Sequence, residues 1–130
     1  MSHPADLGTV KEGSYVILED EPCRVVQVDR SKPGKHGSAK IRLFAIGIFT
    51  NSKKSFVGPA ESKIEIPMID KRSGQVISVN NNVYQLMDME TFETFETSSV
   101  EEELKPKLQP GTEVEYWKVL DKAKIVRVKG

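Results

Sequence analysis

The sequence predicts an all-β protein made of two small units, and three observations point to this fold class. Short runs of β-branched and apolar residues recur along the chain, separated by Gly, Pro, Asn or Asp, which is typical of strands and turns. No long segment shows the apolar spacing of an amphipathic helix. The charge balance also changes near Pro67: residues 1–67 hold ten bases and eight acids, and residues 68–130 hold nine bases and eleven acids. We therefore expect one domain in residues 1–67 and another in residues 68–130.

The first domain is expected to hold five short strands after a polar N-terminal stretch whose first few residues should be poorly ordered. Turn residues separate the strands at Glu19–Pro22, Asn51–Ser52 and Gly58–Pro59, and Gly47 marks a bulge or bend in the longest strand. Frequent turns between short strands favour a small β-barrel. The expected strands are Ser14–Leu18, Cys23–Val28, Ala39–Ile48, Lys54–Val57 and Ile64–Ile66.

The second domain shows the same pattern, with one short helix added. Its first two strands, Gln75–Val79 and Val83–Met89, flank Asn80–Asn82, and Asn tolerates the left-handed backbone of a turn. Val100–Leu104 is the helical candidate, with Ser98 or Ser99 as its N-cap. A helix between the third and fourth of five strands fits an OB-fold. The remaining expected strands are Thr91–Thr97, Glu113–Lys118 and Ala123–Lys129.

Four aromatic residues of the second domain are candidates for stacking on nucleic acid bases. However, seven acids and no base lie between Arg72 and Lys105, so this surface should repel phosphates. We therefore expect core packing for most of the four, which are Tyr84, Phe92, Phe95 and Trp117.

One stretch of the first domain is predicted to be an exposed loop between two strands. Proline presets a turn conformation and glycine tolerates positive φ, so Lys35 should stand at the tip as a flexible cation. The loop runs Ser31-Lys32-Pro33-Gly34-Lys35-His36-Gly37-Ser38-Ala39-Lys40.

The charge around this loop is one-sided, because residues 30–60 contain seven bases and no acid. Such a local field attracts polyanions, of which nucleic acid is the commonest. The alternative is a solvated loop with basic strand edges, since edge lysines also prevent aggregation. Under the first interpretation the RNA-binding residues are Arg30, Lys32, Lys40, Arg42, Lys53 and Lys54.

Catalytic and metal-binding patterns are weak. The sequence around Lys35 does not match a phosphate-binding P-loop. A catalytic lysine would need a desolvated site that lowers its pKa, and an exposed loop tip does not provide one. Cys23 and His36 form a formal nucleophile–base pair, but no orienting residue is evident, and Cys23 is expected to be a buried hydrophobe. The only other histidine is His3. We expect no catalytic residue, no metal site and, with one cysteine, no internal disulfide.

The ten residues from Ser31 to Lys40 resemble the signature of the translation initiation factor 5A family, the relatives of bacterial elongation factor P. Every fixed position of Ser-Lys-x-Gly-Lys-His-Gly-x-Ala-Lys is present. The resemblance extends over most of the chain, and short termini are similar to those of archaeal members. Further matching positions are Gly47–Phe49, Lys54–Val57 with Pro59, and Val114–Tyr116.

This resemblance implies an SH3-like barrel in residues 1–67 and an OB-fold in residues 68–130. It also implies that Lys35 is converted to deoxyhypusine or hypusine. In this modification a butylamine group is transferred from spermidine to the lysine, and deoxyhypusine synthase is the modifying partner. The protein would be a translation factor, not an enzyme and without a cofactor, that binds the ribosome and peptidyl-tRNA. It would promote peptide bond formation at stalled sequences such as proline runs.

Independently of the resemblance, no apolar run approaches the roughly 20 residues that cross a bilayer, and no secretory signal is visible. We therefore expect a cytoplasmic protein that binds no membrane, and we expect a monomer.

Two alternatives remain open from the residues alone. One is an RNA-binding protein of SH3-plus-OB type whose lysine is never modified. The other is a small hydrolase that uses Cys23 and His36. An intact mass separates the family function from the first alternative, and Cys23→Ser tests the second.

Overall fold

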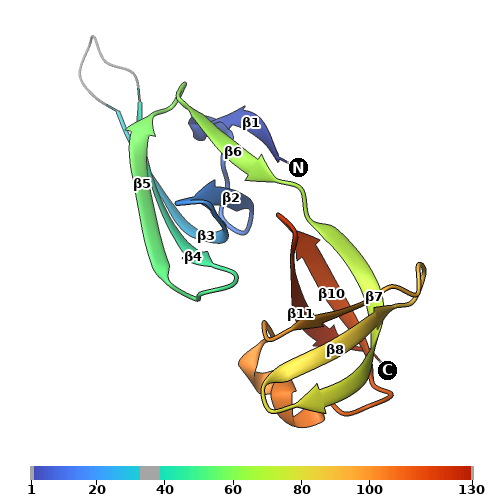
Figure 1. Cartoon of the computed structure of the whole chain (residues 1–130). Helices are drawn as coiled ribbons and strands as arrows, with labels where there is room; N and C mark the ends of the chain where they lie inside the picture. Colours follow the sequence, from blue (N-terminus) through green and yellow to red (C-terminus); the bar gives the residue numbers. More distant parts are fainter. Residues whose placement is uncertain (1, 33–38, 130) are drawn as a thin grey trace. The chain divides into compact units, whose positions relative to one another are not determined.

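The computed structural model describes residues 2–32 and 39–129, and within them it is all-β apart from two short 3₁₀ helices. The chain forms two compact units, residues 1–68 and residues 69–130. Figure 1 shows the strands of each unit. Among the described residues, no helix is long and apolar enough to span a membrane.

The described residues of the first unit form six strands and the 3₁₀ helix η1 (Leu7–Thr9). The strands are β1 Ser2–Asp6, β2 Tyr15–Leu18, β3 Glu21–Ser31, β4 Lys40–Gly47, β5 Lys53–Pro59 and β6 Lys63–Pro67. The larger sheet has the order β2-β3-β4-β5, so its strands pair with their neighbours in sequence, and β1 pairs with β6 (Figure 1).

The core of the first unit follows the two-residue alternation of a strand. In β4, Ile41, Leu43 and Ala45 are buried, whereas Lys40 and Arg42 are exposed. The buried face therefore packs inward and the polar face meets solvent. The other members of this core are Leu7, Val10, Val16, Leu18, Cys23, Val25 and Ile64.

Two expectations for the first unit are wrong. The N-terminal residues, expected to be poorly ordered, form β1, which pairs with β6 from Ser2 opposite Pro67 to Asp6 opposite Lys63. Backbone pairing needs no apolar pattern, and an ion pair from Lys63 to Asp6 adds to it. The turn expected over Glu19–Pro22 is shorter: only Glu19 and Asp20 turn, both at positive φ (52° and 64°).

The second unit contains five strands and the 3₁₀ helix η2 (Glu102–Lys107). The strands are β7 Asp70–Asn80, β8 Val83–Asp88, β9 Thr94–Thr97, β10 Glu113–Val119 and β11 Lys122–Val128. The sheet order is β11-β10-β7-β8-β9. A parallel bridge between Val100 and Ile125 joins the segment after β9 to β11 and closes the barrel.

The helix of the second unit differs from the expectation. Val100 belongs to the closing bridge, and η2 begins after Glu101, which makes no side-chain cap. Neither Ser98 nor Ser99 is the N-cap, because Glu101 occupies that position. The carbonyl of Ser99 instead accepts a hydrogen bond of 3.0 Å from the N–H of Ile125 in β11. Residues that the sequence assigned to the first helical turn and its cap therefore pair with β11, at the seam where the barrel closes.

The third strand of this unit is shorter than expected, because residues 91–93 belong to the turn after β8. Tyr84 is buried and Phe95 packs on the core beside Tyr116, with ring centroids 5.0 Å apart. Phe92 differs: its side chain is 67% exposed and its backbone has φ 63°. Core packing is thus the role of Tyr84 and Phe95 but not of Phe92.

A buried carboxylate, Asp88 (3% exposed), fixes this turn. It lies 2.5 Å from Nε of Arg72 and 2.6 Å from the hydroxyl of Tyr116, and it accepts the N–H groups of Glu90 and Thr91 at 2.8 and 2.9 Å. The hydrogen bond from Arg72 is the main reason that the pKa of Asp88 lies far below its ordinary value, against the opposing effect of burial. One acid thereby connects three strands to the β8–β9 turn.

Candidate nucleic-acid interface and modification loop

The strands β3 and β4 form a hairpin that leads to the predicted modification loop (Figure 1). Their pairing continues to Ser31 opposite Lys40, at the two ends of that loop. Residues 33–38 lie outside the described residues, and with them Lys35 and His36. The hairpin therefore brings Ser31 and Lys40 together, whereas the form of the loop and the role of Lys35 stay predictions.

The register of β3, β4 and β5 gathers cations on one face of the sheet. Lys40 and Arg42 alternate with the buried residues of β4, so their side chains are on its solvent face. Arg24 and Lys53 both lie opposite Ile46, which belongs to the same alternation. All four cations are exposed. We call this the basic face, made of Arg24, Lys40, Arg42 and Lys53.

A β-bulge makes the basic face continuous along β3. The register shifts between Val25 and Gln27, and a bulge of this kind adds one residue to one strand. Because of that extra residue, Arg24 before the bulge and Asp29 after it share the solvent side, where Asp29 pairs with Arg42. Asp29 is the one acid that the register places among these cations.

Arg24 is a member that the sequence-based prediction missed. It lies outside the acid-free stretch that drew attention to residues 30–60. The available signal was the alternation around it, because Cys23 and Val25 are both fully buried and the residue between them must point the other way.

Arg30 and Lys54, both predicted to bind RNA, have partners inside the first unit. The guanidinium of Arg30 donates to the carbonyls of Gly8 and Val10 at 2.8 and 3.2 Å. The amine of Lys54 lies 2.7 Å from a carboxylate oxygen of Glu19, and its side chain is 14% exposed. Their RNA contacts therefore remain predictions that compete with a structural role. Lys32 is exposed.

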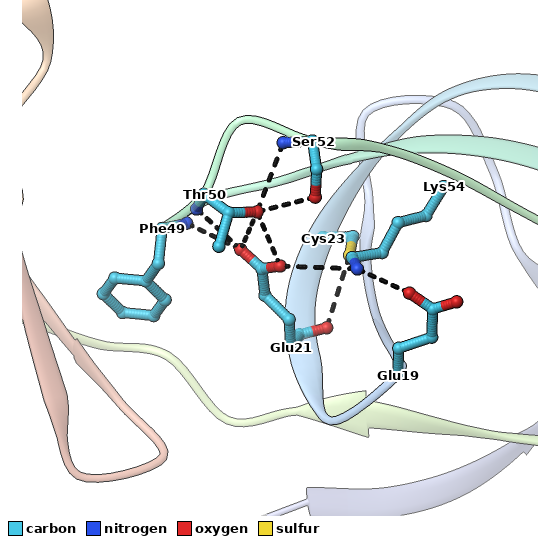
Figure 2. A network of polar contacts seen from close by, with 7 residues as sticks. All are labelled: Glu19, Glu21, Cys23, Phe49, Thr50, Ser52 and Lys54. Carbon is cyan, nitrogen blue, oxygen red and sulfur yellow. Dashed lines mark hydrogen bonds and ion pairs between the residues drawn. The ribbon is translucent and has the colours of Figure 1, made fainter.

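Lys54 belongs to a network around the buried Glu21 (Figure 2). The carboxylate of Glu21 accepts the N–H groups of Phe49 and Thr50 at 3.1 and 2.8 Å and the hydroxyl of Thr50 at 2.8 Å. Burial by itself would raise the pKa of Glu21, but the hydrogen bonds from Thr50 and Phe49 and the charge of Lys54 hold it below the ordinary value of 4.5. A Cβ on Gly47 would overlap this carboxylate. Glu21 thus fixes the β4–β5 turn that precedes Lys53.

The same network includes the single cysteine, and its environment does not favour a nucleophile. The thiol of Cys23 is fully buried and donates to the carbonyl of Glu21 at 3.3 Å. Burial raises the pKa of this thiol and the nearby charge of Glu21 raises it further, so the reactive thiolate is disfavoured. Among the described residues, no group of three or more His, Cys, Asp or Glu is placed to hold a metal ion.

We expect Glu21→Gln to lower the free energy of unfolding of the first unit by about 1.5–3 kcal/mol at pH 7, because the substitution removes hydrogen bonds to a charged group. Since the folded pKa of Glu21 is lowered, its contribution is full above 4.5 and fades as pH falls below that value. The difference between variant and parent should therefore shrink at pH 3. Urea titrations followed by the amide resonances of residues 2–32 and 39–68 measure it, and the exposed Glu61→Gln is the control. An equal difference at both pH values would contradict this role.

Comparisons with known proteins cover both units. A family model described as translation initiation factor 5A-like, N-terminal, matches residues 1–62. A second, described as eukaryotic elongation factor 5A hypusine, DNA-binding OB fold, matches residues 68–129. The hypusine description thus belongs to the model of the second unit, whereas Lys35 falls in the range of the first.

Individual relatives agree with these family models. The chain is 55% identical over 124 residues to translation initiation factor 5A of Korarchaeum cryptofilum, covering 95% of this chain and 92% of the relative. It is 50% identical over 127 residues to the protein of that name from Hyperthermus butylicus, covering 97% and 93%.

Solved structures show the same similarity. Eukaryotic translation initiation factor 5A from Methanococcus jannaschii matches with a TM-score of 0.89 and 43% identity, over 98% of this chain and 95% of that one. A translation initiation factor eif-5a family protein from Naegleria fowleri matches with a TM-score of 0.76 and 27% identity, over 99% of each chain. The predicted fold class, an N-terminal SH3-like barrel followed by an OB-fold, is confirmed.

Proposed function

Because this chain belongs to the translation initiation factor 5A family, we propose that it binds the ribosome beside peptidyl-tRNA and promotes peptide bond formation at stalled sequences such as proline runs. The family makes it a translation factor. The reaction centre belongs to the ribosome, so the protein is not an enzyme and needs no cofactor. It contributes orientation, which by itself lowers the barrier of a reaction between two bound partners. It works in the cytoplasm as a monomer.

The proposed chemistry depends on Lys35. In a reaction run by deoxyhypusine synthase, its amine forms a C–N bond to the aminobutyl group of spermidine, whose bond to the secondary amine breaks and releases 1,3-diaminopropane. The product is deoxyhypusine or, after a separate hydroxylation, hypusine. The longer side chain carries a second amine that holds the acceptor end of the tRNA. The observation that carries this proposal is the complete ten-residue motif, whose ends Ser31 and Lys40 are paired at the tip of the β3–β4 hairpin.

An intact mass of protein purified from its native host tests the modification. The proposal expects the mass of the chain plus an added butylamine group, assigned to Lys35 by fragmentation. The same gene expressed in a host without the modifying enzyme is the control and should give the unmodified mass. An unmodified mass from the native host would favour the alternative, an RNA-binding protein with SH3 and OB domains and a plain lysine.

We expect the basic face to meet ribosomal or transfer RNA. Neutralising two of its members in Arg42→Gln with Lys53→Gln should weaken binding to purified ribosomes, most at low salt. The slope of log affinity against log salt should flatten by about 0.7–0.9 for each RNA phosphate that the variant no longer neutralises. The matched control is Lys11→Gln with Lys107→Gln, which removes two exposed cations that are not in the basic face. An unchanged slope in the basic-face variant would place the RNA-binding surface elsewhere.

A further inference from the structure

The second unit contains a hollow of about 630 Å³ that its proposed role in translation does not use. One wall is the continuous run of residues 93–99, which includes all of β9. The lining also includes Lys118 of β10, Asp121 of the β10–β11 turn and Lys122 of β11, together with Arg72, Asp88 and Tyr116. All of its lining residues lie between residues 70 and 123, so the hollow belongs entirely to the second unit.

The wall formed by β9 is a strand edge. In the order of the sheet β9 comes last, and among the described strands β8 is its one partner. The N–H of Asp88 donates to the carbonyl of Glu93 at 2.9 Å. In an antiparallel pair such bonds recur at every second residue, so Phe95 and Thr97 also bond to β8. It follows that the N–H and C=O groups of Thr94 and Glu96 point away from β8, along the free edge.

This free edge is short because the barrel seam closes it. The hydroxyl of Thr97 donates to the carbonyl of Ala123 at 2.7 Å, and the N–H of Ile125 donates to the carbonyl of Ser99 at 3.0 Å. At its other end the edge begins at the β8–β9 turn, which the buried Asp88 holds in place. The edge is therefore fixed at both ends before any ligand arrives, which reduces the ordering cost of binding.

The charges around the hollow indicate which ligand fits. Its lining includes the carboxylates of Asp70, Asp88, Glu93, Glu96 and Asp121 against three bases. Arg72, one of those bases, already lies within 2.5 Å of Asp88 and 3.2 Å of Asp70. Such a lining repels phosphate groups and attracts cations, so a nucleic acid is a poor occupant. A second copy of the chain, docked by the same edge, would place its carboxylates of Glu93 and Glu96 against the same carboxylates here, and like charges repel.

We propose that this hollow is a docking site for an extended, lysine- or arginine-rich segment of a partner protein, which adds as a strand to the edge of β9. Strand addition takes its affinity from main-chain hydrogen bonds and its specificity from alternate side chains. The groups of Thr94 and Glu96 supply the main-chain bonds. The cationic side chains are received by Glu93, Glu96 and Asp121, the lining acids that are not paired with Arg72. The exposed Phe92, between the lining residues Thr91 and Glu93, adds apolar surface for the segment to cover.

The test uses the whole protein and a fluorescent peptide of alternating Lys and Val, about six residues long as a typical strand. Three probes serve as comparisons: a Glu-Val peptide, a Lys-Val peptide methylated at every second amide nitrogen, and oligouridine. The Lys-Val peptide should bind, and the amide resonances of Thr94 and Glu96 should shift and exchange with solvent more slowly. The methylated peptide should bind at least about fivefold more weakly, because it cannot form all of the main-chain hydrogen bonds.

Two variants locate the site. Thr94→Pro removes an outward N–H without touching the bonds to β8, and proline is tolerated on an edge strand. Glu96→Lys reverses a charge of the wall and keeps the folded protein available if Thr94→Pro unfolds. Each should weaken Lys-Val binding about fivefold or more, whereas Glu90→Gln, an exposed acid of the adjacent turn outside the lining, should not.

Several results would overturn the proposal. Equal binding of the methylated peptide excludes strand addition, and preference for Glu-Val or oligouridine excludes a cationic segment. Shifts confined to other residues exclude this location. Absence of Lys-Val binding up to about 1 mM excludes a specific site altogether. None of these results bears on the modification of Lys35, which the intact mass tests separately.

Discussion

Lys35→Arg is expected to abolish function in a strain that lacks this factor, although the substitution keeps a positive charge and much of the side-chain length. A guanidinium is planar and stays protonated, so it does not offer the nucleophilic amine that aminobutyl transfer requires. It also lacks the second, more distant amine of the modified side chain. If Lys35 only bound a phosphate, arginine would serve about as well, because both cations bind phosphate.

Complementation, scored by growth and by ribosome pausing at consecutive prolines, measures this effect. Lys32→Arg is the matched control, because Lys32 belongs to the same motif and is exposed but is not the modified position. It should complement fully. The stability of Lys35→Arg should change by less than about 0.5 kcal/mol, as is usual for a surface substitution. Full rescue by Lys35→Arg would refute the modified-lysine mechanism and favour an unmodified RNA-binding protein.

Asp88→Asn is expected to be the most damaging single substitution in the second unit, at about 3–5 kcal/mol of unfolding free energy, the usual cost of breaking a buried ion pair. An amide does not balance the charge of Arg72, and one of its two polar atoms is a donor facing other donors. The hydroxyl of Tyr116 and the turn N–H groups of Glu90 and Thr91 then share one acceptor oxygen where the carboxylate offered two. The β8–β9 turn should loosen with them.

Trp117, the one tryptophan, lies in β10 and reports the unfolding of the second unit in urea. Glu90→Ala in the same turn is the control, and its effect should stay within about 0.5 kcal/mol. Because the folded pKa of Asp88 is lowered, its contribution is complete above 3.8 and declines as pH falls below that value. The difference in unfolding free energy between the parent and Asp88→Asn should therefore become smaller in acid. A gap below about 1 kcal/mol at pH 7 would mean that the pair is not a main support of the turn.

The sequence was most informative where burial dictates the alternation of residue types. In β4, each buried aliphatic residue is followed by a polar or half-buried one, and a strand was predicted there. The pattern failed for β1, since Ser2–Asp6 is held by main-chain pairing with β6 and by a charge, neither of which leaves an apolar period. It failed again at Phe92, because the turn in which it lies is held by Asp88, whose main partner, Arg72, is distant in the sequence.

The candidate site was predictable in part. A run of bases without acids marks residues 30–60, but only the register between strands tells which of those bases share a face. Lys40, Arg42 and Lys53 are on it, whereas Arg30 donates to backbone carbonyls of the same unit and Lys54 is paired with Glu19. Such partnerships join residues 20 or more positions apart, and a local pattern cannot indicate them.

The bulge at Val26 gives β3 one residue more than its pairing with β4 needs. Val25 pairs with Ala45 and Gln27 with Phe44, which leaves Val26 between two successive pairs. Removing that one residue would leave a plain alternation in which Arg24 stays on the solvent side and Cys23 stays in the core. Removing a second residue between Arg24 and Asp29 would instead put these two residues on opposite sides of the sheet. Relatives that keep the basic face can therefore lack the bulge residue without any change in which side chains are buried.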